Sequence, residues 1–555
     1  MKENKKKNGL LLVIDSLRYD TLCNTKFSDY LFPNLSKLKK HSVFTSCFSN
    51  GIATQLTLPS LFSLTYPLDY GGYENGIRER PRSFIECFKE QGYRTHLLGN
   101  CTEIATQYDD YHRGFDTIQT TQDFGNVIET KISRTIRPRF LKLSKSAQNS
   151  EESLNYLIKE IRILCQSILK SMESPDTICW SKRLYNHNKK IAKSCEEELI
   201  LLDKNPLEIK NKILKPVPRN YWNSFGYYKY LGKSKPNKYK IFFVKLFHVS
   251  SFKVRQFIRK INFLPFARNM NTVTVKSDKL LPELIKSLKS TSKPWLVYCH
   301  LMDVHDNGEI QDLHALLKRI IYYPKWLLAK LKGFTKRSFT YDTALILLDK
   351  MLAPLITDII ENNQLSDTVV IVTSDHGSSK AYSPKRKNGE KDYFLGLYEE
   401  AIKVPLLIYN PKPQTKKNCK LIDSMGVSAT FLETLNIPFH ESFKGISLYS
   451  GGKSIVISEH AGRGLPNLIN GALYFVLTSQ SEKLFICIKE EELILKFYNL
   501  LIDPLEENNL IEKEEYRPKI LLMLKYFFKE RGDIIANRLK KIKCKKFDFK
   551  IEDIN

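Results

Sequence analysis

The chain has 555 residues, of which 42% are hydrophobic and 11% aromatic, and this excludes an intrinsically disordered protein. The formal net charge of +27 is compatible with an anionic substrate, an anionic membrane surface or nucleic acid. A lysine-rich composition without functional meaning gives the same charge. No nucleic-acid-binding motif accompanies it, so we do not expect a nucleic-acid partner.

The cysteine pattern and the apolar runs bear on the compartment. The eleven cysteines are scattered and include no CxxC pair, which is typical of reduced, buried thiols and favours a cytosolic protein. The apolar run Leu10–Ile14 is cut off by Asp15 and is too short for a signal peptide. No stretch approaches the roughly 18 apolar residues of a membrane helix. We therefore expect a cytoplasmic protein, with peripheral membrane contact left open.

Two predicted strands end in acidic residues. Leu10–Ile14 leads into Asp15, and the β-branched run Val369–Val372 is followed closely by Asp375 and His376. Because ligands bind at the carboxyl ends of the strands of open α/β sheets, we expect these side chains to converge. Carboxylate oxygen and imidazole nitrogen are common ligands of divalent cations. A strand that ends in an ordinary polar turn has the same pattern, so both interpretations stay open at this point.

A helix is expected to begin near Pro59, because polar residues precede this proline and an apolar run follows it. Thr57 would then lie at the helix N-terminus, where the simplest role of its hydroxyl is to cap the helix. Beside a metal, the same hydroxyl could act as a nucleophile, with backbone N–H groups holding an anionic ester.

The sequence changes in character between residues 131 and 281. Basic helical stretches such as Glu151–Met172 alternate with a Tyr- and Lys-rich segment at 218–240, and runs at 240–249 and 252–266 mix cations with large apolar residues. We interpret this region as a basic helical insertion that packs on the main domain as a lid. A surface that touches a membrane or binds lipid is the alternative.

Strand character returns at residues 294–299, and His300, Asp303, His305 and Asp306 follow within a few positions. So many imidazoles and carboxylates at one strand end favour metal or substrate binding over a role in the core. A helix is expected from about Tyr341 to Asn363.

The last third of the chain alternates further strands and helices. A basic loop begins at Lys380, a strand at Val404, and a helix covers about Ser424–Leu435. From residue 455 onward, short strands and turns precede a basic helix. This pattern predicts a small α+β subdomain at the C-terminal end.

Taken in order, these motifs resemble the sulfatase-like branch of the alkaline phosphatase superfamily. Residues 15–20 read DSLRYD and residues 373–377 read TSDHG, and both match metal-binding markers of that branch; residues 398–405 and 497–510 match later markers. The resemblance implies a three-layer α/β/α sandwich with a mostly parallel central sheet. The implied parts are an α/β domain (1–130 and 282–450), the helical insertion (131–281), and the C-terminal subdomain with its basic helix (451–555).

The resemblance also implies a hydroxyl nucleophile. Sulfatases proper carry Cys or Ser in a C/S-x-P-S-R motif, oxidised to formylglycine, whereas residues 57–61 here read TLPSL. A Thr-x-Pro pattern resembles the nucleotide pyrophosphatase/phosphodiesterase branch and indicates Thr57, which we favour. The pattern of phosphoethanolamine transferases would indicate Thr54 instead.

One or two divalent cations (Zn, Mn, Ca or Mg) are implied as cofactors. The expected metal ligands are Asp15, Asp375, His376, His305 and His460. The expected substrate-binding residues are Asn100, His300 and Lys380. Asn100 replaces a sulfatase lysine, and His460 is considered because no histidine follows between Gly377 and Tyr398.

The resulting hypothesis is a metal-dependent hydrolase or transferase that acts on a phosphate ester or diester through a threonine. Its substrate would be an anionic ester, for example one linked to a glycan or a lipid. One alternative is sulfate-ester hydrolysis. Another is a catalytically inactive sulfatase-like protein that binds an anionic glycan or lipid.

Overall fold

The computed structural model describes most of the chain. The described residues are 6–144, 150–173, 181–214, 269–270, 277–291, 294–305, 309–310, 313–362, 365–379, 381, 396–410, 421–461, 472–489 and 492–539. The chain divides into two compact units. The first unit comprises residues 1–28, 36–93 and 365–555, and the second comprises residues 29–35 and 94–364.

The central element of the fold is a mostly parallel sheet of seven strands. In the first unit its strands follow the order β2-β9-β8-β1. Their bounds are β1 (Asn8–Ile14), β2 (Val43–Phe48), β8 (Thr368–Thr373) and β9 (Lys403–Tyr409). Every residue of β1 and β8 is buried, as expected for parallel strands covered on both faces. β1 and β8 pair in parallel, while β9 runs antiparallel to β8 and to β2.

Several helices belong to the first unit. Their bounds are α3 (Thr54–Ser63), α4 (Phe84–Glu90), α16 (Glu399–Ile402), α17 (Ser424–Thr434) and α18 (Arg517–Leu539). Two short helices, α1 (Thr25–Leu31) and α2 (Pro33–Lys40), include the sequence boundary between the units. α3 and α17 lie against each other, and every residue of α3 is buried. α3 is therefore held firmly at a fixed rotation about its axis.

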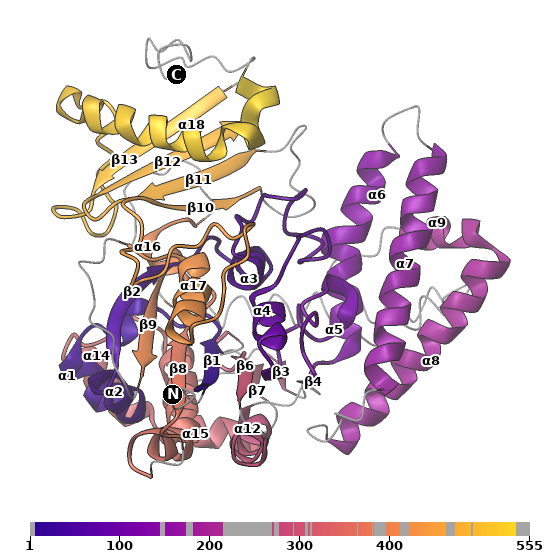
Figure 1. The fold of residues 1–555 in the computed structure, drawn as a ribbon, viewed down its shortest axis with the longest axis horizontal. Helices are drawn as coiled ribbons and strands as arrows, with labels where there is room; N and C mark the ends of the chain where they lie inside the picture. The colour runs from indigo at the N-terminus through magenta and orange to yellow at the C-terminus, as the bar shows by residue number, and fades with distance from the viewer. Residues whose placement is uncertain are drawn as a thin grey trace, which may run out of the picture. The chain divides into compact units, whose positions relative to one another are not determined.

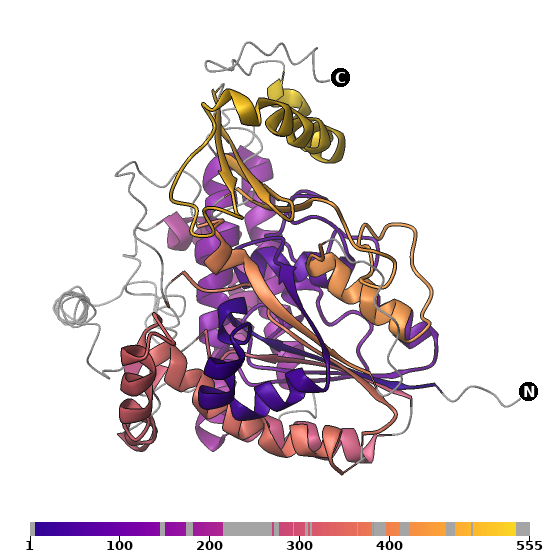
Figure 2. The ribbon, with the colours of Figure 1, turned by 90° about the vertical axis from the view of Figure 1, so that its left-hand side faces the viewer.

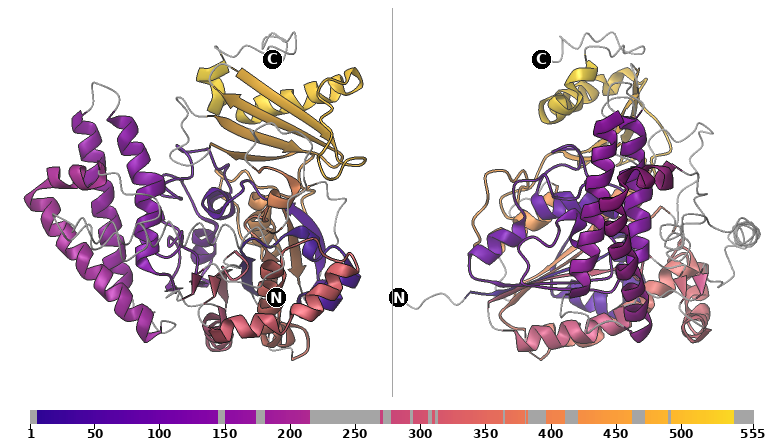
Figure 3. Two further views of the ribbon diagram at one scale, coloured as in Figure 1. Left: turned by 180° about the vertical axis from the view of Figure 1, so that it is seen from behind. Right: turned by 90° about the vertical axis from the view of Figure 1, so that its right-hand side faces the viewer.

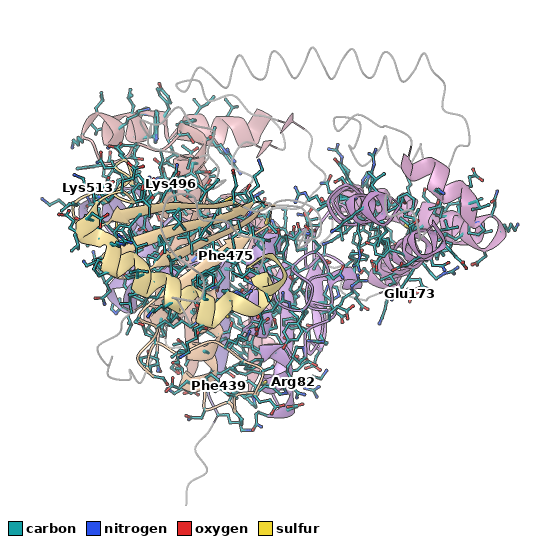
Figure 4. All side chains as sticks on the ribbon, turned by 90° about the horizontal axis from the view of Figure 1, so that it is seen from above. Arg82, Glu173, Phe439, Phe475, Lys496 and Lys513 are labelled. Atoms are coloured by element: carbon teal, nitrogen blue, oxygen red, sulfur yellow. The ribbon has the colours of Figure 1, made fainter. Side chains whose placement is uncertain are left out.

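A second sheet of four antiparallel strands lies at the C-terminal end of the first unit. Its strands are β10 (Val456–His460), β11 (Leu473–Thr478), β12 (Glu482–Lys489) and β13 (Glu492–Asn499). α18 runs along this sheet (Figure 1), and the view from above shows it crossing the strands beside Phe475 (Figure 4). The rings of Phe475 and Phe527 meet edge to face with centroids 4.8 Å apart. The sheet and α18 thus form the expected α+β subdomain.

The second unit contributes β6-β3-β4 to the large sheet, all parallel. Its strands are β3 (Arg94–Gly99), β4 (Thr117–Thr120), β5 (Asn269–Met270), β6 (Trp295–Leu301) and β7 (Glu309–Ile310). Its helices are α5 (Phe124–Lys131), α6 (Arg137–Leu143), α7 (Ser150–Glu173), α8 (Lys182–Lys204), α9 (Pro206–Leu214), α12 (Ser277–Ser290), α13 (Leu313–Ile320), α14 (Tyr323–Leu331) and α15 (Phe339–Ile360). α6, α7 and α8 are seen side by side in Figure 3.

The α/β class with a mostly parallel central sheet is confirmed, and so are the strands that precede Asp15 and Asp375. The helices predicted at Glu151–Met172 and Tyr341–Asn363 correspond to α7 and α15. The domain boundaries at 130/131, 281/282 and 450/451 stay predictions. The apolar and basic runs at 240–249 and 252–266 lie outside the described residues.

One expected helix start is wrong. α3 begins at Thr54, five residues before Pro59, which lies inside the helix. Ala53 is extended and its carbonyl oxygen accepts hydrogen bonds from the N–H groups of Leu56 and Thr57, at 2.9 and 3.1 Å. This backbone contact starts the helix without any side-chain cap, so the proline is not the first-turn residue.

The cysteines behave as expected within the described residues. Eight of them are free thiols, and all of these except Cys23 are buried. In the part of the chain that the structure describes, no helix has the length and apolar character needed to cross a bilayer.

Candidate metal centre and active site

The site begins where β1 and β8 end. Because the two strands pair in parallel with Val13 opposite Thr373, the residues that follow them leave the sheet at the same edge. The N–H of Leu17 donates to Ser374 Oγ at 2.9 Å and ties the two loops together. Asp15 and Asp375 are thereby placed beside each other, almost completely buried.

Local contacts orient the first carboxylate. Ser16 has φ +64°, a left-handed conformation that is uncommon for serine, and its hydroxyl donates to Asp15 Oδ1 at 2.9 Å. The other oxygen, Asp15 Oδ2, accepts a 2.9 Å hydrogen bond from Thr54 Oγ1. Thus a strained backbone and two hydroxyl groups fix the Asp15 side chain.

His376 completes the cluster. Its Nδ1 lies 2.6 Å from the carbonyl oxygen of Gly377, which can only accept, so Nδ1 is the donor and Nε2 faces the two carboxylates. Nε2 is 3.5 Å from Asp15 Oδ1 and 3.5 Å from Asp375 Oδ2. Gly377 is required for this turn, since a Cβ there would lie 2.4 Å from the carbonyl oxygen of Glu400.

These three side chains fit a divalent cation. Their ligand atoms lie within 4.8 Å of one another, and all three residues are buried. Two carboxylates buried side by side are costly without a counter-charge. Asp375 Oδ2 has no hydrogen-bond partner among the described residues, so this oxygen is available to a metal. Two carboxylate oxygens and one imidazole nitrogen are common ligands of divalent cations.

Thr54 of α3 contacts the cluster through its hydroxyl group. It is the first residue of α3, and its Oγ1 lies 2.9 Å from Asp15 Oδ2 and 3.4 Å from His376 Nε2. The N-terminus of a ten-residue helix provides backbone N–H groups and a partial positive charge that favour an anion.

Thr57 lies one turn further along α3 and is completely buried. Its Oγ1 is 2.9 Å from Ser49 Oγ and 3.3 Å from the Ala53 carbonyl oxygen. Ser49 in turn donates to the backbone carbonyl oxygen of Asp375 at 2.5 Å. In the contacts recorded for the described residues, Thr57 therefore reaches the cluster only through Ser49 and the main chain.

The comparison with protein families agrees with this arrangement. A sequence model described as "Sulfatase" matches residues 7–172 and 218–437, more than half of the chain. The chain belongs to the sulfatase family. Sulfatase-family proteins generally bind a divalent metal, in keeping with the Asp15, Asp375 and His376 cluster. The matched residues include 131–172 and 218–281, which are parts of the segment predicted to be an insertion.

Individual relatives are distant. An arylsulfatase of Clostridium perfringens (strain 13 / Type A) is 25% identical over 213 residues, 36% of this chain and 41% of that protein, so the matched region spans less than half of the relative. A phosphonate monoester hydrolase from Silicibacter pomeroyi shares the fold with a TM-score of 0.53 at 14% identity, over 96% of this chain and 97% of that one. A 2-O GAG sulfatase does so with a TM-score of 0.51 at 12% identity, over 96% and 94%.

Arg18 supports this sulfatase-family site, although the sequence pattern had not singled it out. Arg18 is buried, and its guanidinium donates to the Ser378 carbonyl oxygen at 2.8 Å and to both carboxylate oxygens of Asp20. It thereby joins the loops after β1 and β8. The DSLRYD run contained the arginine, but only the tertiary contact shows what it holds.

The other expected metal ligands stay predictions. His460, at the end of β10, is buried and stacks on Tyr474 with ring centroids 4.7 Å apart. It is not a member of the described cluster of ligand atoms. His305 lies in the second unit and is exposed.

The expected substrate contacts also stay predictions. Asn100, in the second unit, accepts a hydrogen bond from the Met302 N–H at 2.8 Å through its Oδ1. His300 is buried on β6 with its Nδ1 2.9 Å from the Tyr298 hydroxyl. Lys380 lies outside the described residues.

Proposed function

We propose that this protein is a metal-dependent hydrolase or transferase of a phosphate ester or diester, with Thr54 as the nucleophile. The supporting observation is the position of the Thr54 hydroxyl, hydrogen-bonded to Asp15 Oδ2 at 2.9 Å and next to the three candidate metal ligands. The sequence pattern favoured Thr57, but the contacts of Thr57 with Ser49 and Ala53 support a structural role for it.

In the first step, Thr54 Oγ1 attacks phosphorus as the bond to the leaving alkoxide breaks, a phospho-threonine forms, and a proton from water converts the alkoxide to the alcohol. Asp15 Oδ2, which already accepts the hydrogen bond of the hydroxyl, orients the attacking oxygen and receives its proton. A bound divalent cation would lower the pKa of the hydroxyl and offset negative charge on the ester. The N-terminal N–H groups of α3 favour the anionic phosphoryl oxygens.

In the second step, water or an acceptor hydroxyl attacks the phospho-threonine. The Oγ1–P bond breaks, and the proton held by Asp15 returns to Thr54 Oγ1. Water as acceptor makes the protein a hydrolase, and an alcohol makes it a transferase. The ester would be anionic and carried on a glycan or a lipid, in line with the positive net charge of the chain.

Sulfate-ester hydrolysis is the second candidate, favoured by the similarity to an arylsulfatase. Against it, threonine occupies both candidate nucleophile positions, and the resemblance assigns formylglycine formation to Cys or Ser. A catalytically inactive protein that binds an anionic glycan or lipid is the third candidate. Buried carboxylates left without a metal would favour that candidate.

The test compares turnover of bis(4-nitrophenyl) phosphate and 4-nitrophenyl sulfate by the purified, metal-loaded protein. We expect release of nitrophenol from the phosphate diester and, after rapid acid quenching, a phosphoryl adduct on the peptide that contains Thr54. Turnover of the sulfate alone would support the second candidate. A protein that binds no metal and turns over neither ester would support the third.

Adding an alcohol such as glycerol distinguishes the two acceptors. A transferase would form a glycerol ester of 4-nitrophenyl phosphate, and less free 4-nitrophenyl phosphate would appear. A hydrolase would give the same products with and without glycerol.

A further inference from the structure

An unusual group of exposed apolar side chains lies on α13, α14 and the turn between them. Large apolar residues that are substantially exposed are scattered over the described chain, but five fall within fifteen consecutive positions. They are Leu317 (51% exposed), Ile320 (38%), Ile321 (71%), Leu328 (42%) and Leu331 (76%). Such a concentration marks an interaction surface rather than the isolated exposed residues of an ordinary surface.

The packing of α14 shows that these leucines are not displaced core residues. Trp326 and Ala329 are completely buried, and the Trp326 ring meets Phe339 of α15 edge to face at 5.4 Å. On a helix, Leu328 and Leu331 each follow one of these buried residues by two positions, which is about 200° around the axis. The helix is therefore anchored by one face and presents leucine on the opposite face.

Over residues 317–320, the part of α13 whose side chains are described, the usual polarity is inverted. Arg319 is buried, where the Asp303 carboxylate interacts with its charge, while Leu317 and Ile320 are exposed. A water-facing helix normally shows the reverse pattern. Both helices pack on α15 and lie near one end of it in Figure 2. Their exposed faces thus belong to one region of the second unit.

The charged residues of this stretch of sequence have a single sign, although Asp303 and Asp349 interact with its Arg319 and Lys325. From Leu313 to Tyr341 the sequence contains seven lysines and arginines and no aspartate or glutamate. Lys318 and Lys332 are exposed. Lys325 and Lys330 lie over the rings of Tyr30 and Trp326, at 4.9 and 4.7 Å from the ring centroids. Lys325 and Lys330 thus engage aromatic rings in cation–π contacts, whereas Lys318 and Lys332 face the solvent.

We propose that α13, the following turn and α14 form a surface that binds an anionic phospholipid membrane at its interface. Ile321, Leu328 and Leu331 would enter the boundary of the acyl chains, and Lys318 and Lys332 would contact anionic headgroups. The helices are too short to span a bilayer, so the contact is peripheral. This surface is separate from the 131–281 region and does not depend on the proposed ester chemistry.

A second apolar turn provides a matched control. Leu501 and Ile502 are 74% and 71% exposed, comparable with Ile321 and Leu331, but the sequence from Phe497 to Glu512 contains no lysine or arginine. This turn therefore lacks the cations that would attract it to an anionic membrane. If exposure alone caused binding, both places would contribute.

The experiment is cosedimentation of the full-length protein with phosphatidylcholine vesicles, with and without phosphatidylglycerol. We expect at least about tenfold stronger partitioning onto the anionic vesicles, reduced by high salt. Ile321→Ser with Leu331→Ser, and separately Lys318→Glu with Lys332→Glu, should each lower partitioning about tenfold or more. Leu501→Ser with Ile502→Ser should leave it unchanged.

Several results would overturn the proposal. These are equal binding to neutral vesicles, no binding at all, or an unchanged partition coefficient in the Ile321/Leu331 variant. A dimer that the same variant converts to a monomer would instead assign the surface to a second copy of the chain. Thermal unfolding midpoints close to that of the parent protein verify that the exposed substitutions leave the fold intact.

Discussion

The hydroxyl of Thr54 donates a hydrogen bond of 2.9 Å to Asp15 Oδ2, although the two residues are 39 positions apart. This contact joins the start of α3 to the end of β1. Among the described residues of α3, Thr54 has the only hydroxyl group with a recorded contact to the buried cluster of Asp15, Asp375 and His376. The chemistry proposed for this sulfatase-family chain depends on that contact.

Replacement of Thr54 by alanine should abolish phosphodiester turnover, with a loss of at least about a thousandfold in kcat, because the attacking oxygen is removed. Thr54→Ser should retain part of the activity. Thr57→Val, a matched change one helical turn away, should retain kcat within about tenfold and cost about 1 kcal/mol of stability through its contact with Ser49. Initial rates on bis(4-nitrophenyl) phosphate measure these effects. A dead Thr57→Val enzyme beside an active Thr54→Ala enzyme would reverse the assignment.

Removal of the metal should destabilise the parent protein, because Asp15 and Asp375 are then buried together without a counter-charge. We expect a chelator to lower its thermal midpoint by several degrees. Asp375→Asn should bind substoichiometric metal, measured by elemental analysis, and its midpoint should hardly respond to the chelator. Equal responses of the two proteins would show that the metal binds elsewhere.

Arg531 of α18 ties the C-terminal subdomain to the segment that follows α3 through two buried carboxylates. Its guanidinium contacts Asp69 at 2.7 Å and Glu459 at 2.8 Å, and burial raises the pKa of Glu459 despite this arginine. Arg531→Met should cost about 3–5 kcal/mol in denaturant unfolding, because the buried Glu459 loses its arginine partner, while Asp69 keeps Lys444. The exposed Lys529→Met on the same helix is the control and should change stability little. Similar losses in both variants would contradict this role.

His112 should make stability depend on pH. Burial lowers the pKa of its imidazole to about 4, while its Nε2 lies 2.8 Å from the Ile104 carbonyl oxygen. The unfolded chain, with an ordinary pKa of about 6.5, binds more protons between these values. Stability is therefore complete above about pH 6.5 and falls as the pH drops toward 4, by roughly 3 kcal/mol in total.

His112→Gln removes this titration and keeps a hydrogen-bond donor. The difference in unfolding free energy between parent and variant should therefore change across pH 4 to 6.5 and stay constant above that range. His41→Gln, at an exposed histidine, should follow the parent curve. A constant difference at every pH would mean that His112 is not the responsible group.

The sequence was sufficient for the elements that build the metal cluster. Runs of β-branched and other apolar residues predicted both β1 and β8, and the polar residues after them predicted a shared site. Parallel strands all begin at one edge of the sheet and end at the opposite edge, so the residues that follow them are expected at the same edge. The register of Val13 opposite Thr373 then brings Asp15 and Asp375 together.

The choice between Thr54 and Thr57 lay beyond the sequence. Both residues precede the same proline, and which hydroxyl faces the cluster depends on where α3 begins and how it is rotated. The Ala53 carbonyl and the Asp15 contact fix these features, and both arise from segments brought together by folding.

The periodicity of the buried strands and the residue types at their ends can be read from the amino-acid sequence alone, because these are local properties of the chain. The apolar surface on α13 and α14 depends instead on tertiary packing. In sequence, Trp326, Leu328 and Leu331 look alike as apolar residues of one helix. Packing against α15 buries Trp326 and leaves the two leucines in solvent, since burial is decided by the neighbours a side chain meets and not by its own hydrophobicity.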